Sequence, residues 1–384
     1  MRAAVGPPEA KGMSGFLLGA AGMFAVTYST QAILPQLGRA FHVSPSESGL
    51  TISVVVLALA GGAWLWGPFS DRYGRKRSIV LASMLLVAPT IGAALAPTFA
   101  LLLVCRALQG LCMPGLLTAG VPYITEVFAP RIGGRAMGYY VTALVAGGLI
   151  GRVGVALVAA GLGWRWGIGL LAVLPLAAAL VMRRSLVDLR LPAGGGRAGI
   201  RRQLRNRPLL QATAAGSAFF FTFVGTFSYV VYRLERPPFG YGPAAGSLVF
   251  LLWFLGILGP SFGRLADRIG WRRLALGALA TAAAGLALTL PARLPTLVLG
   301  LALVTVANWA GVTAAQLGVA AATDVDRGAA SGVYFSLYYL TGAVGGYLPG
   351  LAWERFRWNG VASTGLVALA LAAVALRTAH AHFT

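Results

Sequence analysis

One charged string occurs twice in this chain, about half the chain length apart. Residues 67–77 and residues 263–273 both fit the pattern Gly-x-x-x-Asp-Arg-x-Gly-x-(Lys/Arg)-Arg. Each copy follows one long apolar run and precedes another. A duplicated basic connector between apolar segments predicts two related membrane-embedded halves, which is typical of transport rather than of catalysis.

Twelve apolar runs are long enough to cross a bilayer, because a membrane span needs about 20 residues. They cover residues 14–36, 48–70, 78–97, 99–124, 136–160, 164–182, 209–233, 244–265, 274–292, 295–320, 328–351 and 358–378. Only 11% of the residues are charged, against about 25% in soluble domains. We therefore expect an all-α membrane protein with twelve transmembrane helices in two pseudo-symmetric six-helix bundles, residues 1–182 and 208–384, joined by a basic linker at 183–207.

The distribution of basic residues predicts the orientation in the membrane. If the N-terminus is cytoplasmic, 22 of the 31 Lys and Arg residues fall in inside segments and 7 in outside segments. This bias places both termini in the cytoplasm. The formal net charge of +21 does not indicate nucleic-acid binding, because the basic residues lie between apolar runs rather than on one face. We expect the linker arginines to lie against anionic membrane lipids.

The internal repeat extends beyond the connector. Residues 136–142 match residues 330–336 at an offset of 194, and at the same offset Gly151 corresponds to Gly345 and Trp164 to Trp358. The fifth and eleventh predicted helices therefore correspond, as do the second and eighth. Parallel repeats of this kind are related by an axis along the membrane normal, and we expect the substrate between them.

These features resemble the major facilitator superfamily. The connector motif after the second helix and its copy after the eighth carry the resemblance, together with Arg106-x-x-Gln109-Gly110 in the fourth helix. The stretch Tyr28-Ser-Thr-Gln31 before Pro35 strengthens the similarity to bacterial inner-membrane permeases that export drugs and metabolites. The resemblance implies a secondary transporter in the bacterial cytoplasmic membrane that works by alternating access and has neither a metal nor a cofactor.

Two departures from the family pattern concern proton antiport. Many proton-driven antiporters of the family carry a carboxylate in the first helix, where this chain has Tyr28, Ser29, Thr30 and Gln31. The antiporter motif in the fifth helix has proline after its glycine, where this chain has Arg152 after Gly151. Proton-coupled efflux is therefore weighed against import or exchange of an anionic metabolite. A lipid-modifying membrane enzyme and a non-transporting receptor are the alternatives from other classes.

The connector residues are the candidates for conformational gating. Asp71 ends the second helix, and the resemblance suggests that its carboxylate lies on the positive N-terminus of the eleventh helix, near Gly328. Glycine allows a tight turn at position 74. The full gating set is Gly67, Asp71, Arg72, Gly74, Arg75, Lys76, Arg77, Gly263, Asp267, Arg268 and Gly270.

Polar residues within the apolar runs are the candidates for substrate binding or coupling. A charge within a span is costly unless it is paired or faces water, so we expect both Arg106 and Arg152 to face the interior. The other candidates are Tyr28, Gln31, Gln109, Asn308, Trp309 and Tyr338. No acidic residue lies near the predicted midplane, so the cavity is expected to be electropositive and to favour an anionic or neutral small molecule.

Three further expectations concern packing and association. The chain is expected to be a monomer that does not bind nucleic acid. The phenylalanines of 219–223 wind around their helix, so part of this cluster is expected to face lipid. Cys105 and Cys112 lie seven residues apart in one predicted helix, or about 10 Å, which is too far for a disulfide.

Overall fold

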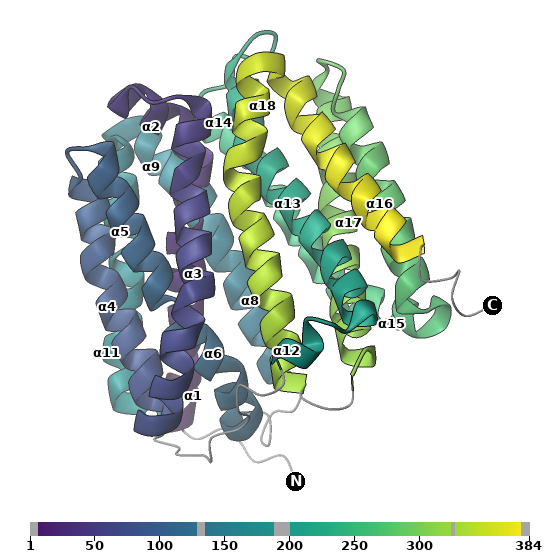
Figure 1. The fold of residues 1–384 in the computed structure, drawn as a ribbon. Helices are drawn as coiled ribbons and strands as arrows, with labels where there is room; N and C mark the ends of the chain where they lie inside the picture. Colours follow the sequence, from purple (N-terminus) through teal and green to yellow (C-terminus); the bar gives the residue numbers. More distant parts are fainter. Residues whose placement is uncertain (1–6, 129–134, 188–199, 324–326, 378–384) are drawn as a thin grey trace. The chain divides into compact units, whose positions relative to one another are not determined.

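A computed structural model describes residues 7–128, 135–187, 200–323 and 327–377. Within these ranges some side chains are not described, including those of Asp71 and Glu126. The described residues form helices and no strand (Figure 1). The chain divides into two compact units: unit 1 contains Met1–His42 and Val54–Ala193, and unit 2 contains Val43–Ser53 and Gly194–Thr384.

Unit 1 is built from helices in the first half of the chain. They are α1 (Pro7–Thr27), η1 (Gln31–Ile33), α2 (Leu34–Phe41), most of α3 (Pro45–Tyr73), α4 (Arg75–Leu95), α5 (Phe99–Cys112), α6 (Pro114–Tyr123), the π-helical turn η2 (Ile124–Phe128), α8 (Arg135–Leu149), the π-helical turn η3 (Ile150–Gly154), α9 (Val155–Leu162), α10 (Trp164–Leu170) and α11 (Val173–Ser185). Helix α1 packs against α8 and α11, and α4 packs against α5, α6, α10 and α11.

Unit 2 contains the remaining helices. They are α12 (Ile200–Gln203), α13 (Arg207–Glu235), α14 (Pro243–Ser247), the 3-10 helix η5 (Leu248–Leu258), α15 (Gly259–Ile269), α16 (Trp271–Leu288), α17 (Leu294–Ala321) and α18 (Arg327–Arg377). Helix α13 packs against α17 and α18, and α16 packs against α17. The N-terminal part of α3 belongs to this unit, whereas the rest of the helix belongs to unit 1.

Among the described residues, ten segments are long and apolar enough to cross a membrane. One of them, Ala329–Arg377, bends at Arg357, whose φ of 53° and ψ of −138° are not helical. Helix α16 is not among the ten, because Arg272 and Arg273 in its first turn lower its mean hydropathy. The all-α membrane fold is confirmed, whereas length and composition alone do not establish the count of twelve. The division at residues 183–207 stays a prediction, since residues 188–199 lie outside the described part.

The phenylalanine cluster of α13 corrects one expectation. Phe219, Phe220, Phe221 and Phe223 are all at most 9% exposed. The most apolar stretch of α13 is 94% buried, more than any other candidate span. The expectation that part of this cluster faces lipid is therefore wrong, because α13 packs against two long helices, α17 and α18.

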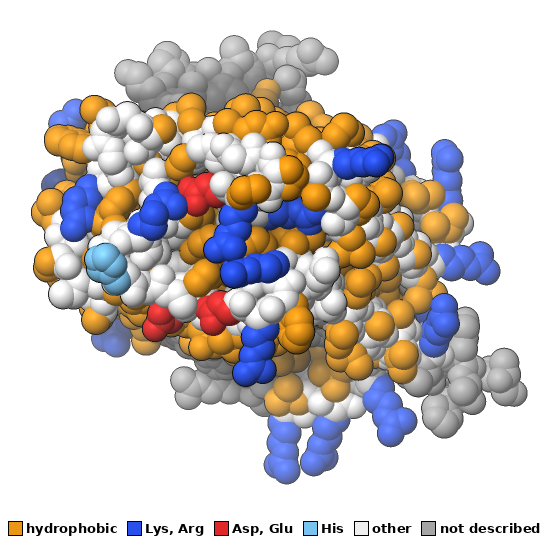
Figure 2. All heavy atoms as spheres, turned by 90° about the horizontal axis from the view of Figure 1, so that it is seen from above, with side chains coloured by type: hydrophobic (Ala, Val, Ile, Leu, Met, Phe, Trp, Pro, Cys, Tyr) orange, Lys and Arg blue, Asp and Glu red, His pale blue; other side chains and the backbone are white. Residues whose placement is uncertain are grey.

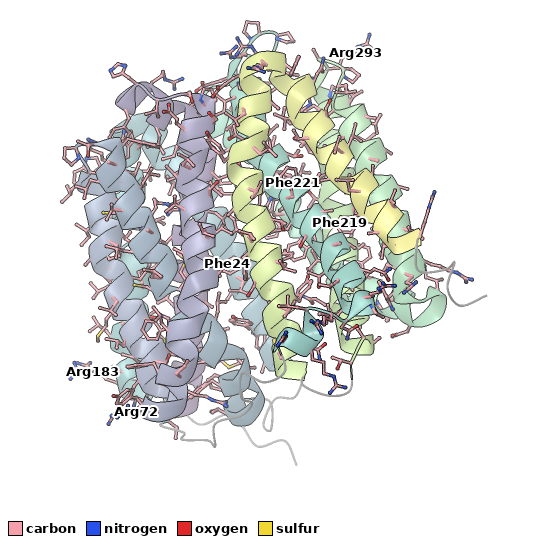
Figure 3. All side chains as sticks on the ribbon, in the orientation of Figure 1. Phe24, Arg72, Arg183, Phe219, Phe221 and Arg293 are labelled. Carbon is pink, nitrogen blue, oxygen red and sulfur yellow. The ribbon has the colours of Figure 1, made fainter. Side chains whose placement is uncertain are left out.

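The ends of each unit differ in their side chains. Arg72 at the end of α3 and Arg183 near the end of α11 lie at the same end of unit 1 (Figure 3), as expected if both are cytoplasmic. Figure 2 looks onto the opposite ends of the helices, where basic and fewer acidic side chains lie among apolar and other side chains. Large apolar side chains are exposed along the described helices, among them Leu65, Leu157 and Ile257, and such a surface is suited to a bilayer rather than to water.

Small residues let α1 and the fifth predicted span approach closely. A Cβ atom added to Gly147 or Gly151 would meet the backbone of Ala21 or Ala25, respectively. Both pairs are spaced four residues apart, so small residues face each other over two successive turns. Unit 2 repeats the arrangement, because a Cβ at Gly345 would lie 2.8 Å from the carbonyl oxygen of Phe221 in α13.

We expect Gly151→Ala to destabilise unit 1 by about 1–3 kcal/mol, the usual cost of forcing extra volume into a packed interior. The matched control is Gly154→Ala in the same π-helical turn, where an added Cβ meets only Ile150, at 3.8 Å. Thermal unfolding of the two purified variants in detergent gives the melting temperature of each. Equal melting temperatures for the two variants would contradict the close approach of the helices.

Candidate substrate site

The first predicted span is interrupted rather than continuous. Helix α1 ends at Thr27, a turn covers residues 28–30, and η1 and α2 continue the path. Proline at position 35 causes part of the break, because it has no N–H to donate and its ring clashes with the carbonyl four residues earlier. The hydroxyl groups of Thr27 and Ser29 bond to the carbonyls of Met23 (2.8 Å) and Val26 (2.9 Å). Such side chains compete with the helical hydrogen bonds.

Arg106 of α5 braces the end of α1. Its guanidinium is fully buried and donates hydrogen bonds to the carbonyl oxygens of Val26 (2.8 Å) and Thr27. It also donates to Gln109 Oε1 at 2.7 Å and to Ser29 Oγ at 3.3 Å. The last carbonyls of a helix lack intrahelical partners and carry the negative end of the helix dipole. The chain's own groups therefore neutralise much of this cation, which favours a structural role.

Gln109 extends the brace to a third helix. Its side-chain amide donates to Thr90 Oγ1 at 3.1 Å, and that hydroxyl donates to the carbonyl of Leu86 at 2.7 Å. Both Gln109 and Thr90 are fully buried. The predicted pair Arg106 and Gln109 thus ties α5 to α1 and α4 by hydrogen bonds inside unit 1.

Arg152 forms a second cluster at the same break. It lies in η3, is fully buried, and donates from Nε to Gln31 Oε1 at 2.7 Å and from a terminal nitrogen to Gly148 O at 2.7 Å. Its guanidinium carbon lies 4.0 Å from the ring centroid of Tyr28, within the range of a cation–π interaction. The structure therefore brings together three of the predicted site residues, Arg152, Gln31 and Tyr28.

The π-helical turn is the unusual backbone feature of this cluster. Turns of this type are rare and occur often at functional sites. Sequence reasoning located Arg152 but not the turn, because the apolar pattern runs through residues 136–160 without interruption. A glycine on either side, Gly151 and Gly154, is the only local signal that could have indicated it.

The electrostatics of the Arg152 cluster favour a negative charge. The turns in contact with Arg152, residues 24–31 and 148–155, contain no Asp or Glu. An arginine keeps its proton at physiological pH, and burying its charge is costly unless polar groups surround it. The partners of Arg152 in the described structure include one amide, one carbonyl and one aromatic ring. A carboxylate or phosphate on a ligand is the chemical group that best completes such a site.

The three predicted residues of unit 2 lie on two helices, α17 and α18. Tyr338 of α18 stacks on Phe220 of α13, with centroids 4.2 Å apart and an angle of 8° between the ring planes. Asn308 and Trp309 lie on α17. Within the described part of the chain, Asn308 Oδ1 and Trp309 Nε1 are buried and have no hydrogen-bond partner. Phe220 belongs to the cluster that was expected to face lipid in part, and it lies buried beside Tyr338 instead.

The two connectors turn at their glycines. Gly74 and Gly270 have φ values of 94° and 83°, a region that residues with a Cβ rarely adopt. Arg72 lies 5.3 Å from the Tyr73 ring centroid, and Asp267 and Arg268 are exposed. Asp71 lies in the last turn of α3, but its side chain is not among those described. Residues 324–326, which precede the predicted eleventh helix, also lie outside the described part of the chain. The gate role of Asp71 stays a prediction.

One acidic residue between the last two predicted spans has defined partners. Glu354 Oε1 accepts hydrogen bonds from the backbone N–H (3.0 Å) and the hydroxyl (2.5 Å) of Ser46, both within unit 2. Two further serines of α3 bond in that unit: Ser48 pairs with the Tyr232 hydroxyl, and Ser53 donates to the carbonyl of Ala343. These contacts hold the start of α3 against α13 and α18.

Comparison with known proteins places this architecture in a family. A family model described as Major Facilitator Superfamily matches residues 16–346. An uncharacterized MFS-type transporter of Bacillus subtilis, YybF, is 30% identical over 345 residues, which is 88% of this chain and 85% of the relative. The inner membrane transport protein YnfM of Escherichia coli is 29% identical over 345 residues, or 88% and 83% of the two chains.

Solved structures show the same fold. A bacterial homolog of the human lysosomal transporter Spinster has a TM-score of 0.78 at 17% identity and covers 99% of this chain and 98% of its own. A D-xylose–proton symporter has a TM-score of 0.71 at 15% identity, with 94% and 97% covered. The chain is thus a polytopic membrane transporter rather than an enzyme. It belongs to the major facilitator superfamily.

Proposed function

We propose that this transporter carries a small organic anion across the bacterial cytoplasmic membrane by alternating access. Arg152 binds the anionic group, Gln31 orients the guanidinium, and the Tyr28 ring supports its planar face. The observation that carries this proposal is the complete burial of the Arg152 guanidinium, in a π-helical turn, against the Gln31 amide and the Tyr28 ring. The guanidinium has several donors in a fixed plane, so it can bind a carboxylate with two parallel hydrogen bonds.

For the direction we propose efflux in exchange for protons, with both termini in the cytoplasm. One support is a partial similarity: residues of this chain are 31% identical over 123 positions to a protein named MFS antiporter QDR3 from Candida albicans. Because the spans lack a midplane acid, coupling uses either the proton of the substrate itself or a peripheral carboxylate. Import or exchange of an anionic metabolite is the second candidate, which the absence of a first-helix carboxylate favours.

The test begins with a binding screen of the full-length protein in detergent. Monocarboxylates, dicarboxylates and organic phosphates are compared with neutral and cationic analogues of similar size, and thermal stabilisation is the measurement. We expect anions to raise the melting temperature, because ligands of the native state stabilise it. Stabilisation by cations alone would overturn the anion proposal.

The second part of the test is transport of the stabilising anion in proteoliposomes. An imposed pH gradient is applied in each direction, and the membrane potential is clamped. Proton-coupled efflux predicts faster movement of the anion against an inward proton gradient. Movement in the same direction as the protons would indicate import, movement independent of pH would indicate exchange, and binding without movement would indicate a receptor.

A further inference from the structure

An apolar groove runs along unit 2 between α15, α16 and α17. It has a volume of about 250 Å³, and nine of its eleven lining residues are apolar, glycine included. The two polar lining residues, Arg273 and Thr281, both lie on α16. With Gly277 they follow one face of that helix at intervals of four residues, a length of about 12 Å. The groove therefore has a cationic end at Arg273 and an apolar remainder.

Gly277 keeps the middle of this groove open. A Cβ atom added there would meet no heavy atom within 4 Å, and the residue is exposed. Leu265 and Ile269 of α15 line one side and are 41% and 37% exposed. Both α15 and α17 lie within candidate membrane spans. An exposed apolar groove in such a position is suited to a hydrocarbon chain.

The charges at the end of the groove favour an anionic headgroup. Arg273 lines this end, and Arg264, Arg268 and Arg272 lie in the same segment of the chain, with Asp267 as its one acidic residue. Arg272 is already engaged, since it donates to Gln211 Oε1 at 3.3 Å and lies 5.3 Å from the Trp271 ring centroid. Arg273 is exposed and makes no hydrogen bond or ion pair with the described residues.

We propose that this groove is a binding site for one anionic phospholipid. Arg273 binds the phosphate, and an acyl chain lies over Gly277 toward Thr281. The cationic end of the groove matches the phosphate of a phospholipid, and its apolar remainder matches an acyl chain. A free phosphate would use only Arg273. A basic residue near a membrane surface strengthens binding of an anionic lipid about fivefold.

Native mass spectrometry of the full-length protein tests this site. The protein is released from detergent containing equal amounts of phosphatidylglycerol and phosphatidylcholine with identical acyl chains. We expect one phosphatidylglycerol to be retained in preference to phosphatidylcholine. We expect Arg273→Gln to reduce this preference about fivefold, and Gly277→Leu, which fills the groove, to reduce retention of both lipids.

Two matched variants control for general effects. Arg377→Gln removes an exposed arginine at the end of α18, and Gly161→Leu adds the same side chain to an open glycine of α9; both are expected to retain lipid as the unmodified protein does. Equal retention of the two lipids by the unmodified protein would overturn the proposal. So would unchanged binding in Arg273→Gln, or displacement of the lipid by glycerol 3-phosphate. If Gly277→Leu does not fold, Thr281→Leu and Arg273→Gln decide the result.

Discussion

Replacing Arg106 with Met is expected to destabilise unit 1 by about 3–5 kcal/mol, the usual cost of breaking a buried polar network. The variant leaves the carbonyls of Val26 and Thr27 and the amide oxygen of Gln109 without the donor that now binds them. Each buried acceptor left unsatisfied costs about 1–3 kcal/mol. Thermal unfolding in detergent should show a melting temperature lower by roughly 6–20 °C.

Two substitutions sharpen this prediction. Arg106→Lys should recover only part of the stability, because one ammonium group cannot replace a planar guanidinium that serves several acceptors at once. Arg183→Gln removes an exposed charge from α11 and should leave the melting temperature unchanged. If Arg106→Met had the same melting temperature as the unmodified protein, the hydrogen bonds of Arg106 would not be a source of stability.

Replacing Arg152 with Gln is expected to affect anion binding more than it affects stability. Anion binding should weaken about 100-fold, which corresponds to about 3 kcal/mol, the value of a hydrogen bond to a charged group. The melting temperature without ligand should fall less than that of Arg106→Met, because the shorter amide removes a buried charge and its desolvation cost while leaving Gln31 Oε1 and Gly148 O without this donor. Anion affinity measured by calorimetry and melting temperature measured by thermal unfolding would distinguish the binding role of Arg152 from the structural role of Arg106.

The neighbouring ring supplies the control for this second prediction. Tyr28→Phe keeps the aromatic face that lies 4.0 Å from the guanidinium carbon, so its anion affinity should stay within a few-fold of the unmodified protein. Tyr28→Leu removes the ring and should weaken binding. An Arg152→Gln protein that binds and transports the anion normally would refute the role proposed for Arg152.

The sequence was sufficient to predict the family and the helical membrane fold. Hydropathy locates spans well because every backbone group in a bilayer must be satisfied internally, which leaves few alternatives to helices. The cost of a charge in a span likewise singles out Arg106 and Arg152 from the sequence alone. Both are fully buried, as that cost requires.

What the sequence could not predict are the interruptions of the helices and the partners of the arginines. Apolar residues continue through the turn at 28–30 and through η3, so hydropathy does not report the change of backbone geometry. The main partners of Arg106 are main-chain oxygens, which every residue has and no sequence pattern marks. Because Arg106 binds main-chain oxygens, a search of the predicted spans for an acidic partner could not have found its position in the structure.

The brace on the first helix has a consequence for how this protein can diverge. A guanidinium that binds main-chain oxygens places few demands on the identity of the residues that carry them, so Val26 and Thr27 can be exchanged for others of similar volume while the bend is kept. Substrate preference can then evolve, or be engineered, by changing side chains around a fixed backbone. Laboratory libraries aimed at new solutes should randomise this neighbourhood and leave Arg106 untouched.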